Sequence, residues 1–523
     1  MNSMSLKKIS RALISVSDKT NLEQVLTALK EFNVEIISTG GTYKFIKDKG
    51  YECIEISNYT GFPEIMDGRV KTLHPKIHGG LLGDTDKTNH TSAMKENAID
   101  EINLVIVNLY PFEAKLLDPA STKEILIENI DIGGPSMLRS AAKNFKHVTV
   151  LPNVKYYEEF ITVLKQNNGS TDLHFRQKMA NETFNETAYY DSMISNWMNQ
   201  IHDNKFSDKK TIGGKIVSQL RYGENPHQES AVYEIPGNFD GFSKLKQLQG
   251  KELSHNNYLD SYSAYNLVTD FDPKKPICAI IKHNNPCGCA IDPNGTNAYL
   301  KALSGDPISA FGGVVALNYT INAELAAELV KTFYEVILTP SIDKEALAIL
   351  AQKKNLRVLE YTLPEKNKIQ HLTFLQKTFL AQDENTKILS KADLKIVTKK
   401  KPTDQEIENL LFANQICKHV KSNAIVITKN NTTLGVGAGQ TSRVGSSEIA
   451  CANAKKFFPD DVTGCGAASD AFFPFADGLE TLVQLGVKSI IQPGGSIRDQ
   501  EVIDAADAAD IAMVFTGIRN FKH

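Results

Sequence analysis

Residues that could carry out chemistry occur in two separate sets, one in each half of the chain. The first set lies within the first 150 residues, and the second begins after residue 220. Each set combines glycine-rich turns, cationic side chains and at least one group that can transfer a proton. Two such sets indicate two active sites, and two active sites on one polypeptide suggest consecutive reactions.

The first set opens with Ser38-Thr39-Gly40-Gly41-Thr42, which follows an apolar run and precedes a helical pattern. Glycines at the start of a helix let the backbone approach a ligand, and the free amides there favour phosphate. The hydroxyls of Ser38, Thr39 and Thr42 would add further donors. The segment therefore predicts a phosphate site, although an ordinary strand-to-helix turn capped by Ser and Thr is the alternative.

A second element of this set is dense in cationic and imidazole side chains. Within ten residues it holds Arg69, Lys71, Thr72, His74, Lys76 and His78. Pro75 and the pair Gly79-Gly80 disfavour a helix here and predict a loop. A cationic loop beside a phosphate turn would bind an anion, and a solvated basic loop is the alternative.

Two further motifs of the first half bring groups suited to proton transfer. Asn108-Leu109-Tyr110 ends an apolar strand, and ligands gather at that edge of a parallel sheet. Asp131-Ile132-Gly133-Gly134 leads into a helix that holds Arg139 and Lys143. A carboxylate, a phenol and two lysines around a phosphate pocket would suit ring closure or isomerisation. The alternatives are a plain N-cap for the aspartate and a core position for the tyrosine.

The second set centres on Lys282-His283, which ends an apolar run and precedes Asn284-Asn285-Pro286. An adjacent cation and imidazole can handle an amine nucleophile and the oxyanion that it creates, whereas an isolated pair can also be ordinary surface. A polar turn at 221–228 and a loop of small residues at 309–313 favour the catalytic interpretation. The glycine-rich run 435–439 lacks the lysine of a P-loop, and we expect a turn that lets Arg443 reach an anion.

The composition is typical of a globular enzyme, with 523 residues, 41% hydrophobic, 23% charged and a net charge of −3. This charge argues against general nucleic-acid binding, and no apolar run is long enough to span a membrane. Seven scattered cysteines and an N-terminus without a signal-peptide pattern predict reduced thiols in the cytosol. Cys287 and Cys289 lack the spacing of a zinc deaminase, so we expect packing residues and no metal.

Length and pattern predict two α/β domains, residues 1–202 and 203–523, divided at the polar stretch 202–210. In the first domain, strands alternate with helical patterns, which predicts a parallel sheet covered on both faces. Its strands are expected at 12–16, 34–38, 52–56, 104–109 and 148–151, with helices over 153–202. In the second domain they are expected at 277–281, 314–317, 424–428, 489–492 and 512–515. The charged stretch 384–405 is expected to be a solvated connection between two subdomains, and no short repeat is evident.

Together these motifs give the first half a specific resemblance. Ser15-Val16-Ser17-Asp18-Lys19-Thr20, residues 38–42, residues 69–75 and Asp131–Gly134 are similar to the inosine monophosphate (IMP) cyclohydrolase domain of the bifunctional purine-biosynthesis enzymes. The resemblance implies a methylglyoxal synthase-like, doubly wound parallel sheet. It also implies that Lys71, Tyr110, Asp131 and Lys143 are catalytic. The substrate-binding residues that it implies are Ser15, Ser17, Lys19, Ser38, Thr39, Gly40, Gly41, Thr42, Arg69, Thr72, Asn108, Ile132, Gly133 and Gly134.

The resemblance continues through the second half and so covers essentially the whole chain. This half is similar to the formyltransferase domain of the same family, which implies a cytidine deaminase-like α/β region with two subdomains and without the metal. Lys282 and His283 are then the catalytic pair. Substrate-binding roles are implied for Arg221, Tyr222, His227, Phe311, Gly312, Glu335, Asn423, Arg443, Phe473, Asp477, Arg519 and His523. Glu335 falls where some relatives place Asp.

The family resemblance implies two reactions. A formyl group passes from the co-substrate 10-formyltetrahydrofolate to aminoimidazole carboxamide ribonucleotide (AICAR), and the formylated product (FAICAR) then cyclises to IMP with loss of water. It further implies a homodimer that shares its formyltransferase sites across the interface. Two other interpretations stay open: a regulatory phosphate-ligand module in the N-terminal half, or a methylglyoxal synthase-like lyase fused to an inactive deaminase-like domain. Nucleic-acid editing is disfavoured by the acidic charge and the missing zinc motif.

Overall fold

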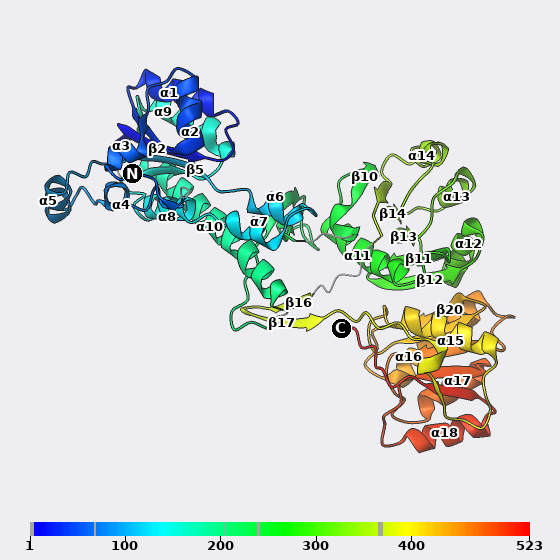
Figure 1. Cartoon of the computed structure of the whole chain (residues 1–523). Coiled ribbons are helices and arrows are strands. Elements are labelled where there is room, and N and C mark those ends of the chain that lie inside the picture. The colour runs from blue at the N-terminus through cyan, green and yellow to red at the C-terminus, as the bar shows by residue number, and fades with distance from the viewer. Residues whose placement is uncertain (1–4, 67–68, 203, 238–240, 364–369) are drawn as a thin grey trace. The chain divides into compact units, whose positions relative to one another are not determined.

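The computed structural model describes residues 5–66, 69–202, 204–237, 241–363 and 370–523. The chain divides into two compact units, residues 1–217 with 233–238 and residues 218–232 with 239–523 (Figure 1). The boundary expected between residues 202 and 203 falls at Asp203, which lies outside the described residues. Each unit has its own sheet and its own hydrophobic core. Among the described residues, no helix combines the length and apolarity needed to cross a bilayer.

The N-terminal unit is built around a five-stranded parallel sheet of order β4-β3-β2-β5-β6. Its strands are β2 (Arg11–Val16), β3 (Glu35–Ser38), β4 (Ile54–Glu55), β5 (Leu104–Asn108) and β6 (Thr149–Leu151). The apolar run of β5 is buried along four of its five residues, as expected for a central parallel strand. The predicted parallel sheet is confirmed, with β4 shorter than expected because α3 (Ile56–Thr60) begins directly after it.

Helices complete this unit. The longer ones are α1 (Leu22–Glu31), α2 (Gly40–Asp48), α8 (Gly133–Lys143), α9 (Tyr157–Gln166) and α10 (Leu173–Ile201). Helix α1 packs against α9, and α8 packs against α10. The shorter elements are β1 (Lys7–Lys8), α5 (Thr88–Glu96), α6 (Phe112–Leu117), α7 (Lys123–Glu128), η2 (Val154–Tyr156) and β7 (Ser170–Thr171). The helices expected over 153–202 are therefore present as α9 and α10.

The prediction of a loop around Gly79-Gly80 is wrong, because these residues belong to helix α4 (Pro75–Leu82). His74 caps this helix by accepting the backbone amide of Lys76, and a proline at the first helical position needs no hydrogen-bond partner. The glycines are there for packing. A Cβ at Gly79 would lie 2.8 Å from the Ile99 side chain, and one at Gly80 would lie 2.6 Å from the Asp100 carbonyl oxygen.

The second unit contains one twelve-stranded mixed sheet, of order β10-β15-β14-β13-β11-β12-β20-β19-β21-β22-β23-β18. Its first six strands are β10 (Lys246–Gln249), β11 (Ile277–Lys282), β12 (Asn285–Ile291), β13 (Val314–Leu317), β14 (Val336–Thr339) and β15 (Arg357–Glu360). The other six are β18 (Lys395–Ile396), β19 (Ile425–Lys429), β20 (Thr432–Gly437), β21 (Gly466–Ser469), β22 (Ser489–Gln492) and β23 (Ala512–Phe515). All five strands expected in this half are present.

The sheet is built from two halves with the same order of elements. In each half a helix precedes a two-stranded hairpin, and three strands connected by helices follow it. These three strands run parallel to one another, and the first of them pairs antiparallel with the first strand of the hairpin. The first half contains α11 (His255–Thr269), α12 (Gly295–Gly305), α13 (Ala323–Leu329) and α14 (Lys344–Leu350). The second contains α15 (Asp404–Cys417), α16 (Arg443–Phe457), α17 (Asp477–Leu485) and α18 (Asp499–Ala508). The two halves join where β12 pairs with β20.

The repetition extends to single residues. A Cβ at Gly288 in β12 would overlap the carbonyl oxygen of Ala302 in α12, and one at Gly435 in β20 would overlap that of Ala450 in α16. Both hairpins also carry a register shift at the same place, after Ile280 in one and after Ile427 in the other. The glycine-rich run 435–439 therefore begins in a strand that packs closely on a helix, and the turn expected over its whole length is wrong.

The charged stretch 384–405 is largely exposed, but it is more than a connection. It contains η4 (Lys391–Asp393) and the edge strand β18, which pairs with β23. The remaining elements of this unit are η3 (Gly241–Lys244) and the hairpin of β16 (Gln370–Leu375) and β17 (Thr378–Asp383). Strands β8 (Lys215–Leu220) and β9 (Ser230–Glu234) pair where the chain passes from one unit to the other.

Candidate active sites

In the N-terminal unit, the motifs of the first set converge at the carboxyl ends of β2, β3 and β5. The hydroxyl oxygens of Ser15 and Thr39 lie 2.9 Å apart. Asn108 accepts the backbone amide and the hydroxyl of Ser17 through its Oδ1, at 2.7 and 2.8 Å. Parallel strands of an α/β sheet present their ligands at this edge. The segments 15–17, 38–42 and 108–110 thus form one candidate site.

The turn at residues 38–42 offers backbone amides rather than the hydroxyls that were expected to bind phosphate. Ser38 donates its hydroxyl to the Ile14 carbonyl at 2.7 Å, and Thr42 donates to the Val16 carbonyl at 2.9 Å. Both side chains are buried, so they join the turn to β2. The amides of Gly40 and Gly41 open α2, where no intrahelical carbonyl can accept them, and they remain suited to an anion.

Lys71 and Thr72 connect this turn to the start of α8. A Cβ built on Gly40 would lie 3.2 Å from the Lys71 ammonium, which also forms an ion pair with Glu64 at 3.0 Å. A Cβ on Gly133 would lie 2.7 Å from the Thr72 hydroxyl. Both glycines thus stand directly against the basic segment, and a cation lies at the phosphate turn.

Two other cations of this set are placed differently. Arg69 pairs with Glu128 on the exposed surface. The Lys19 ammonium lies 3.4 Å from the carbonyl oxygens of Val16 and Ser17, at the end of β2. Lys19 is therefore at the edge of the site, whereas Arg69 forms an exposed ion pair with Glu128.

Asp131 is the titratable group with the most unusual surroundings in this site. Its carboxylate accepts the Gly134 amide at 2.8 Å and also the backbone amide of Tyr110. Burial raises the pKa of Asp131, and these two hydrogen bonds oppose the rise. The carboxylate therefore joins the end of β5 to the start of α8. The Tyr110 ring beside it is half exposed, and Ile132 is exposed, so both are accessible to a ligand.

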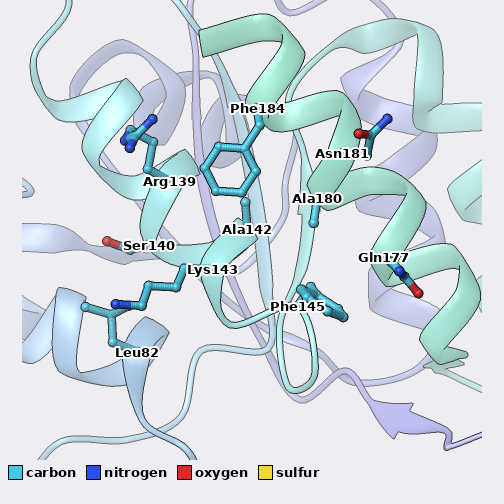
Figure 2. Close-up of a pocket in the computed structure, with 10 residues that line it drawn as sticks. All are labelled: Leu82, Arg139, Ser140, Ala142, Lys143, Phe145, Gln177, Ala180, Asn181 and Phe184. Atoms are coloured by element: carbon cyan, nitrogen blue, oxygen red, sulfur yellow. The ribbon is translucent and has the colours of Figure 1, made fainter. Parts of the chain in front are cut away.

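Lys143 does not reach this group. It ends α8, and a rise of about 1.5 Å per residue places it roughly 15 Å along the helix axis from Gly133. With Arg139 it lines a separate cavity of about 600 Å³. Figure 2 shows Arg139 and Lys143 of α8 on one side of this cavity and Gln177 and Asn181 of α10 on the other. Within one chain, Lys143 is thus not part of the Asp131 site.

In the second unit, Lys282 and His283 line a cavity of about 420 Å³. Lys282 ends β11, and a two-residue turn, His283 (φ 52°) and Asn284 (φ 60°), leads into β12. The left-handed conformation of both turn residues matches the twist of a tight hairpin. His283 is exposed, while Lys282 is partly buried and donates to the Phe311 carbonyl at 2.8 Å. The expected catalytic pair therefore lines one cavity.

The loop that holds Phe311 also contributes to this region. Gly312 has φ 76°, a conformation that favours glycine, and its amide donates to the Phe333 carbonyl at 2.7 Å. The Phe311 ring is 59% exposed and lies 5.2 Å from the Phe333 ring. An exposed aromatic face beside a lysine and a histidine suits a planar ligand.

Four residues of the cavity with amide, carboxylate or hydroxyl side chains were not named from the sequence as binding residues. They are Asn285, Asp306, Ser309 and Asn453. Asp306 accepts the Ser309 amide at 2.9 Å. Asn453 comes from α16 in the second half of the sheet and donates to the Val436 carbonyl. Asn285, Asp306 and Ser309 lie in or next to motifs that the sequence analysis named, whereas nothing in the sequence connects residue 453 to residue 282.

Several binding positions implied by the resemblance have other partners here. Arg443 is buried, pairs with the fully buried Asp470 and donates to Asn423, so its expected freedom to reach an anion is wrong. Phe473 is a buried core residue rather than part of a site wall. Glu335 pairs with Arg357.

The remaining implied binding residues are exposed or partly exposed. Arg221 lies over the Tyr222 ring at 4.8 Å, and His227 follows in the same turn. Arg519 lies over the Phe521 ring at 4.4 Å, and His523 and Asp477 are exposed. These side chains are accessible to a ligand, but no cavity described above includes them.

The cysteines and the metal question can be treated together. Cys289 is buried, and Cys287 lines the second cavity with its pKa raised to about 12 by burial. A neutral thiol is a poor nucleophile and a poor metal ligand. Among the described residues, one group has metal-ligand character: Asp84, Asp86 and His147. Lys87 and Lys146 pair with its two carboxylates, so its charge is already compensated.

Comparison with known families identifies the class of protein. The family "AICARFT/IMPCHase bienzyme" matches residues 141–453, and the family "MGS-like domain" matches residues 21–136. The chain belongs to the AICARFT/IMPCHase family. It is therefore an enzyme with two activities, AICAR formyltransferase and IMP cyclohydrolase.

Individual relatives agree with this assignment. The "Bifunctional purine biosynthesis protein PurH" of Ruegeria pomeroyi is 47% identical over 99% of this chain and 99% of its own. Proteins with the same description are 46% identical in Rhizobium rhizogenes (99% and 97%) and 47% identical in Brucella canis (99% and 98%). A crystal structure of ForH is 34% identical and covers 36% of this chain and 95% of its own, but its TM-score of 0.33 is too low to inform the fold.

Proposed function

We propose that the cavity around Lys282 and His283 is the site of formyl transfer to AICAR. The observation that carries this proposal is the position of both side chains on one cavity of about 420 Å³. The 5-amine of AICAR is conjugated with its ring and is a poor nucleophile, so a base must take its proton as the new C–N bond forms. His283 is that base, and Lys282 stabilises the oxyanion of the tetrahedral intermediate. Tetrahydrofolate then leaves with the electron pair of the broken C–N bond.

The formyl donor in this proposal is 10-formyltetrahydrofolate, a co-substrate, and no metal takes part. The exposed Phe311 ring supports the assignment, since it offers a face against which a planar pterin or imidazole could stack. The site is tested by following tetrahydrofolate formation from AICAR and 10-formyltetrahydrofolate. His283→Ala should abolish this reaction and leave cyclisation of supplied FAICAR intact; equal loss of both would contradict the assignment.

The N-terminal site is proposed to cyclise FAICAR. The amides of Gly40 and Gly41 hold the nucleotide phosphate, with Lys71 beside them. Asp131 orients or deprotonates the carboxamide nitrogen that attacks the formyl carbon. Lys71 and Tyr110 stabilise the formyl oxygen and deliver a proton to it, so that it leaves as water. The raised pKa of Asp131 fits a carboxylate that exchanges protons during catalysis. In this proposal the cyclohydrolase domain is residues 1–202 and the formyltransferase domain is residues 203–523, with two cytidine deaminase-like subdomains.

Lys143 has a catalytic role in this proposal only if a second copy of the chain delivers it. Its position roughly 15 Å along α8 from Gly133 separates it from Asp131 of its own chain. A homodimer, which we propose as the working state, would permit such delivery. Mixing a Lys143→Ala chain with an Asp131→Asn chain tests this idea: each mixed dimer should regain one of its two sites, about half of the wild-type dimer's cyclisation, while either variant alone should not.

We place the enzyme in the cytosol, with small-molecule substrates and without nucleic-acid or membrane partners. Seven free cysteines, five of them buried, support a reducing compartment. The net charge of −3 argues against general nucleic-acid binding. Fractionation of cells followed by assay of both activities would test this placement.

A further inference from the structure

A carboxylate of α11 accepts a hydrogen bond from the turn that contains His283. Asp260 accepts the backbone amide of Asn284 at 2.7 Å. Ser263, one turn further along α11, donates its hydroxyl to the Asn284 side chain at 2.9 Å. The turn is thereby anchored, through Asn284, to a helix that packs against β11.

The position of Asp260 makes its ionised carboxylate costly to desolvate. It is largely buried, and burial raises its pKa, while the Asn284 amide, His283 and Lys282 oppose the rise. A buried carboxylate that only joined a hairpin to a helix could be replaced by an amide or a hydroxyl at lower desolvation cost. A negative charge at this position stabilises the imidazolium that forms when His283 accepts a proton.

In the second half of the sheet, no carboxylate among the residues that the structure describes accepts a backbone amide of the equivalent turn. The β19–β20 turn has the same left-handed pair, Asn430 (φ 48°) and Asn431 (φ 55°). Its strand-end lysine, Lys429, pairs outward with Asp461. Asparagine adopts this conformation readily because its short polar side chain bonds locally. The carboxylate beneath the first turn is thus associated with the histidine rather than with the hairpin.

We propose that Asp260 is a positioning residue of formyl transfer, which aims the His283 ring into the cavity by holding the Asn284 amide of its turn. It touches neither substrate, so its effect passes through His283. This inference rests on the proposed role of His283 as the base.

Other charged groups near the ring must be considered when its pH dependence is measured. Lys282 lies on the same strand, Asp306 lines the same cavity after α12, and the Lys421 backbone contacts the neighbouring Asn285. Lys282 carries a positive charge and Asp306 a negative one. Since Asp260→Asn leaves both in place, a displacement of the pH profile reports the loss of the Asp260 charge.

The test compares Asp260→Asn with Asp292→Asn in the full-length enzyme. Asp292 also accepts a backbone amide, that of Asn294 at 2.9 Å, but at the opposite end of β12, so it is a matched control. Asp260→Asn should lower kcat for formyl transfer about 10- to 100-fold, change the KM for AICAR less than about threefold, and leave FAICAR cyclisation unchanged. The acid limb of its kcat profile should move to lower pH. Asp292→Asn should behave as wild type.

Two further variants separate this inference from the assignment of the site. Added to His283→Ala, Asp260→Asn should change the residual rate less than about twofold, because both act through one group. Asp260→Glu keeps the charge but moves the carboxylate, so it should lower kcat without the pH displacement. Wild-type kcat in both Asp260 variants, or a loss of cyclisation in parallel with formyl transfer, would overturn the positioning role. Retention of formyl transfer in His283→Ala would instead overturn the proposed function itself.

Discussion

The two hairpins of the twelve-stranded sheet have the same backbone and different chemistry. Each has a lysine at the end of its first strand, a left-handed two-residue turn and the same register shift. In the first, Lys282 and His283 line a cavity; in the second, Lys429 pairs with Asp461 and two asparagines form the turn. The comparison teaches that the fold supplies a turn able to present a side chain, and that residue identity and the surrounding loops decide whether it becomes a site.

The largest effect is expected from making the first turn resemble the second. His283→Asn keeps a residue that tolerates the turn and removes the base, so formyl transfer should fall by about 10²- to 10⁴-fold. Cyclisation of FAICAR by the same protein should stay at the wild-type rate. Adding the reciprocal change, Asn430→His, to His283→Asn should not restore formyl transfer. Recovery of formyl transfer in this double variant would show that the two hairpins are equivalent. Tetrahydrofolate release measures one reaction and IMP absorbance the other.

The two halves also differ in how deeply their ion pairs are buried. Arg443→Met would leave Asp470 charged and fully buried, and should lower the free energy of unfolding by about 3–5 kcal/mol. Arg357→Met in the first half breaks a more exposed pair with Glu335 and should cost less than about 1 kcal/mol. Denaturant titration of both variants measures the difference. Equal costs would mean that the burial of Asp470 has no energetic consequence.

Replacing the lysine at the end of the first strand of each hairpin tests whether its positive charge matters for formyl transfer in one hairpin only. Lys282→Met should lower kcat for formyl transfer by about 10²- to 10³-fold, because the oxyanion loses its stabilising cation. Lys429→Met removes only an exposed ion pair and should leave kcat within about twofold, with a stability change below about 1 kcal/mol. A comparable loss of formyl transfer from both variants would show that the second hairpin also acts in catalysis.

The N-terminal site provides the smallest and most specific prediction. Asp131→Asn should lower cyclisation by about 10²-fold and leave formyl transfer unchanged. Burial raises the pKa of Asp131, so in the wild type the basic form is present above that raised pKa and is lost as pH falls through it. The acid limb of the cyclisation profile should therefore lie above the ordinary pKa of an aspartate and vanish in the variant. An unchanged acid limb would assign the titration to another group.

Local pattern predicted the elements well where burial on both faces leaves a continuous apolar run. The run at 104–109 predicted β5, and the run at 277–281 predicted β11 with Lys282 at its end. Prediction failed where glycine has two uses. Gly79-Gly80 and Gly435 suggested loops, but they permit close packing of α4 and β20 against their neighbours. Composition alone does not distinguish a glycine needed for a turn from one needed for contact.

The candidate sites were predictable as sets of residues rather than as geometry. Asp131, Tyr110 and Lys71 were selected from separate motifs, and the sheet edge brings their segments together. Lys143 was selected with them, yet the straight course of α8 carries it to another cavity. The sequence also could not show that the Ser38 hydroxyl bonds to a neighbouring strand, because a serine in a phosphate-like turn can do either.

The α/β class, the two sets of chemical groups and the residues of the hairpin turn can be read from the chain, because they depend on composition, periodicity and adjacent positions. Folding is what brings Asp260 under the turn of His283, Asn453 into the cavity of Lys282, and Arg443 against Asp470. These pairings connect residues 23 to 171 positions apart along the sequence. Their proximity follows from strand order and helix packing, which no local pattern specifies.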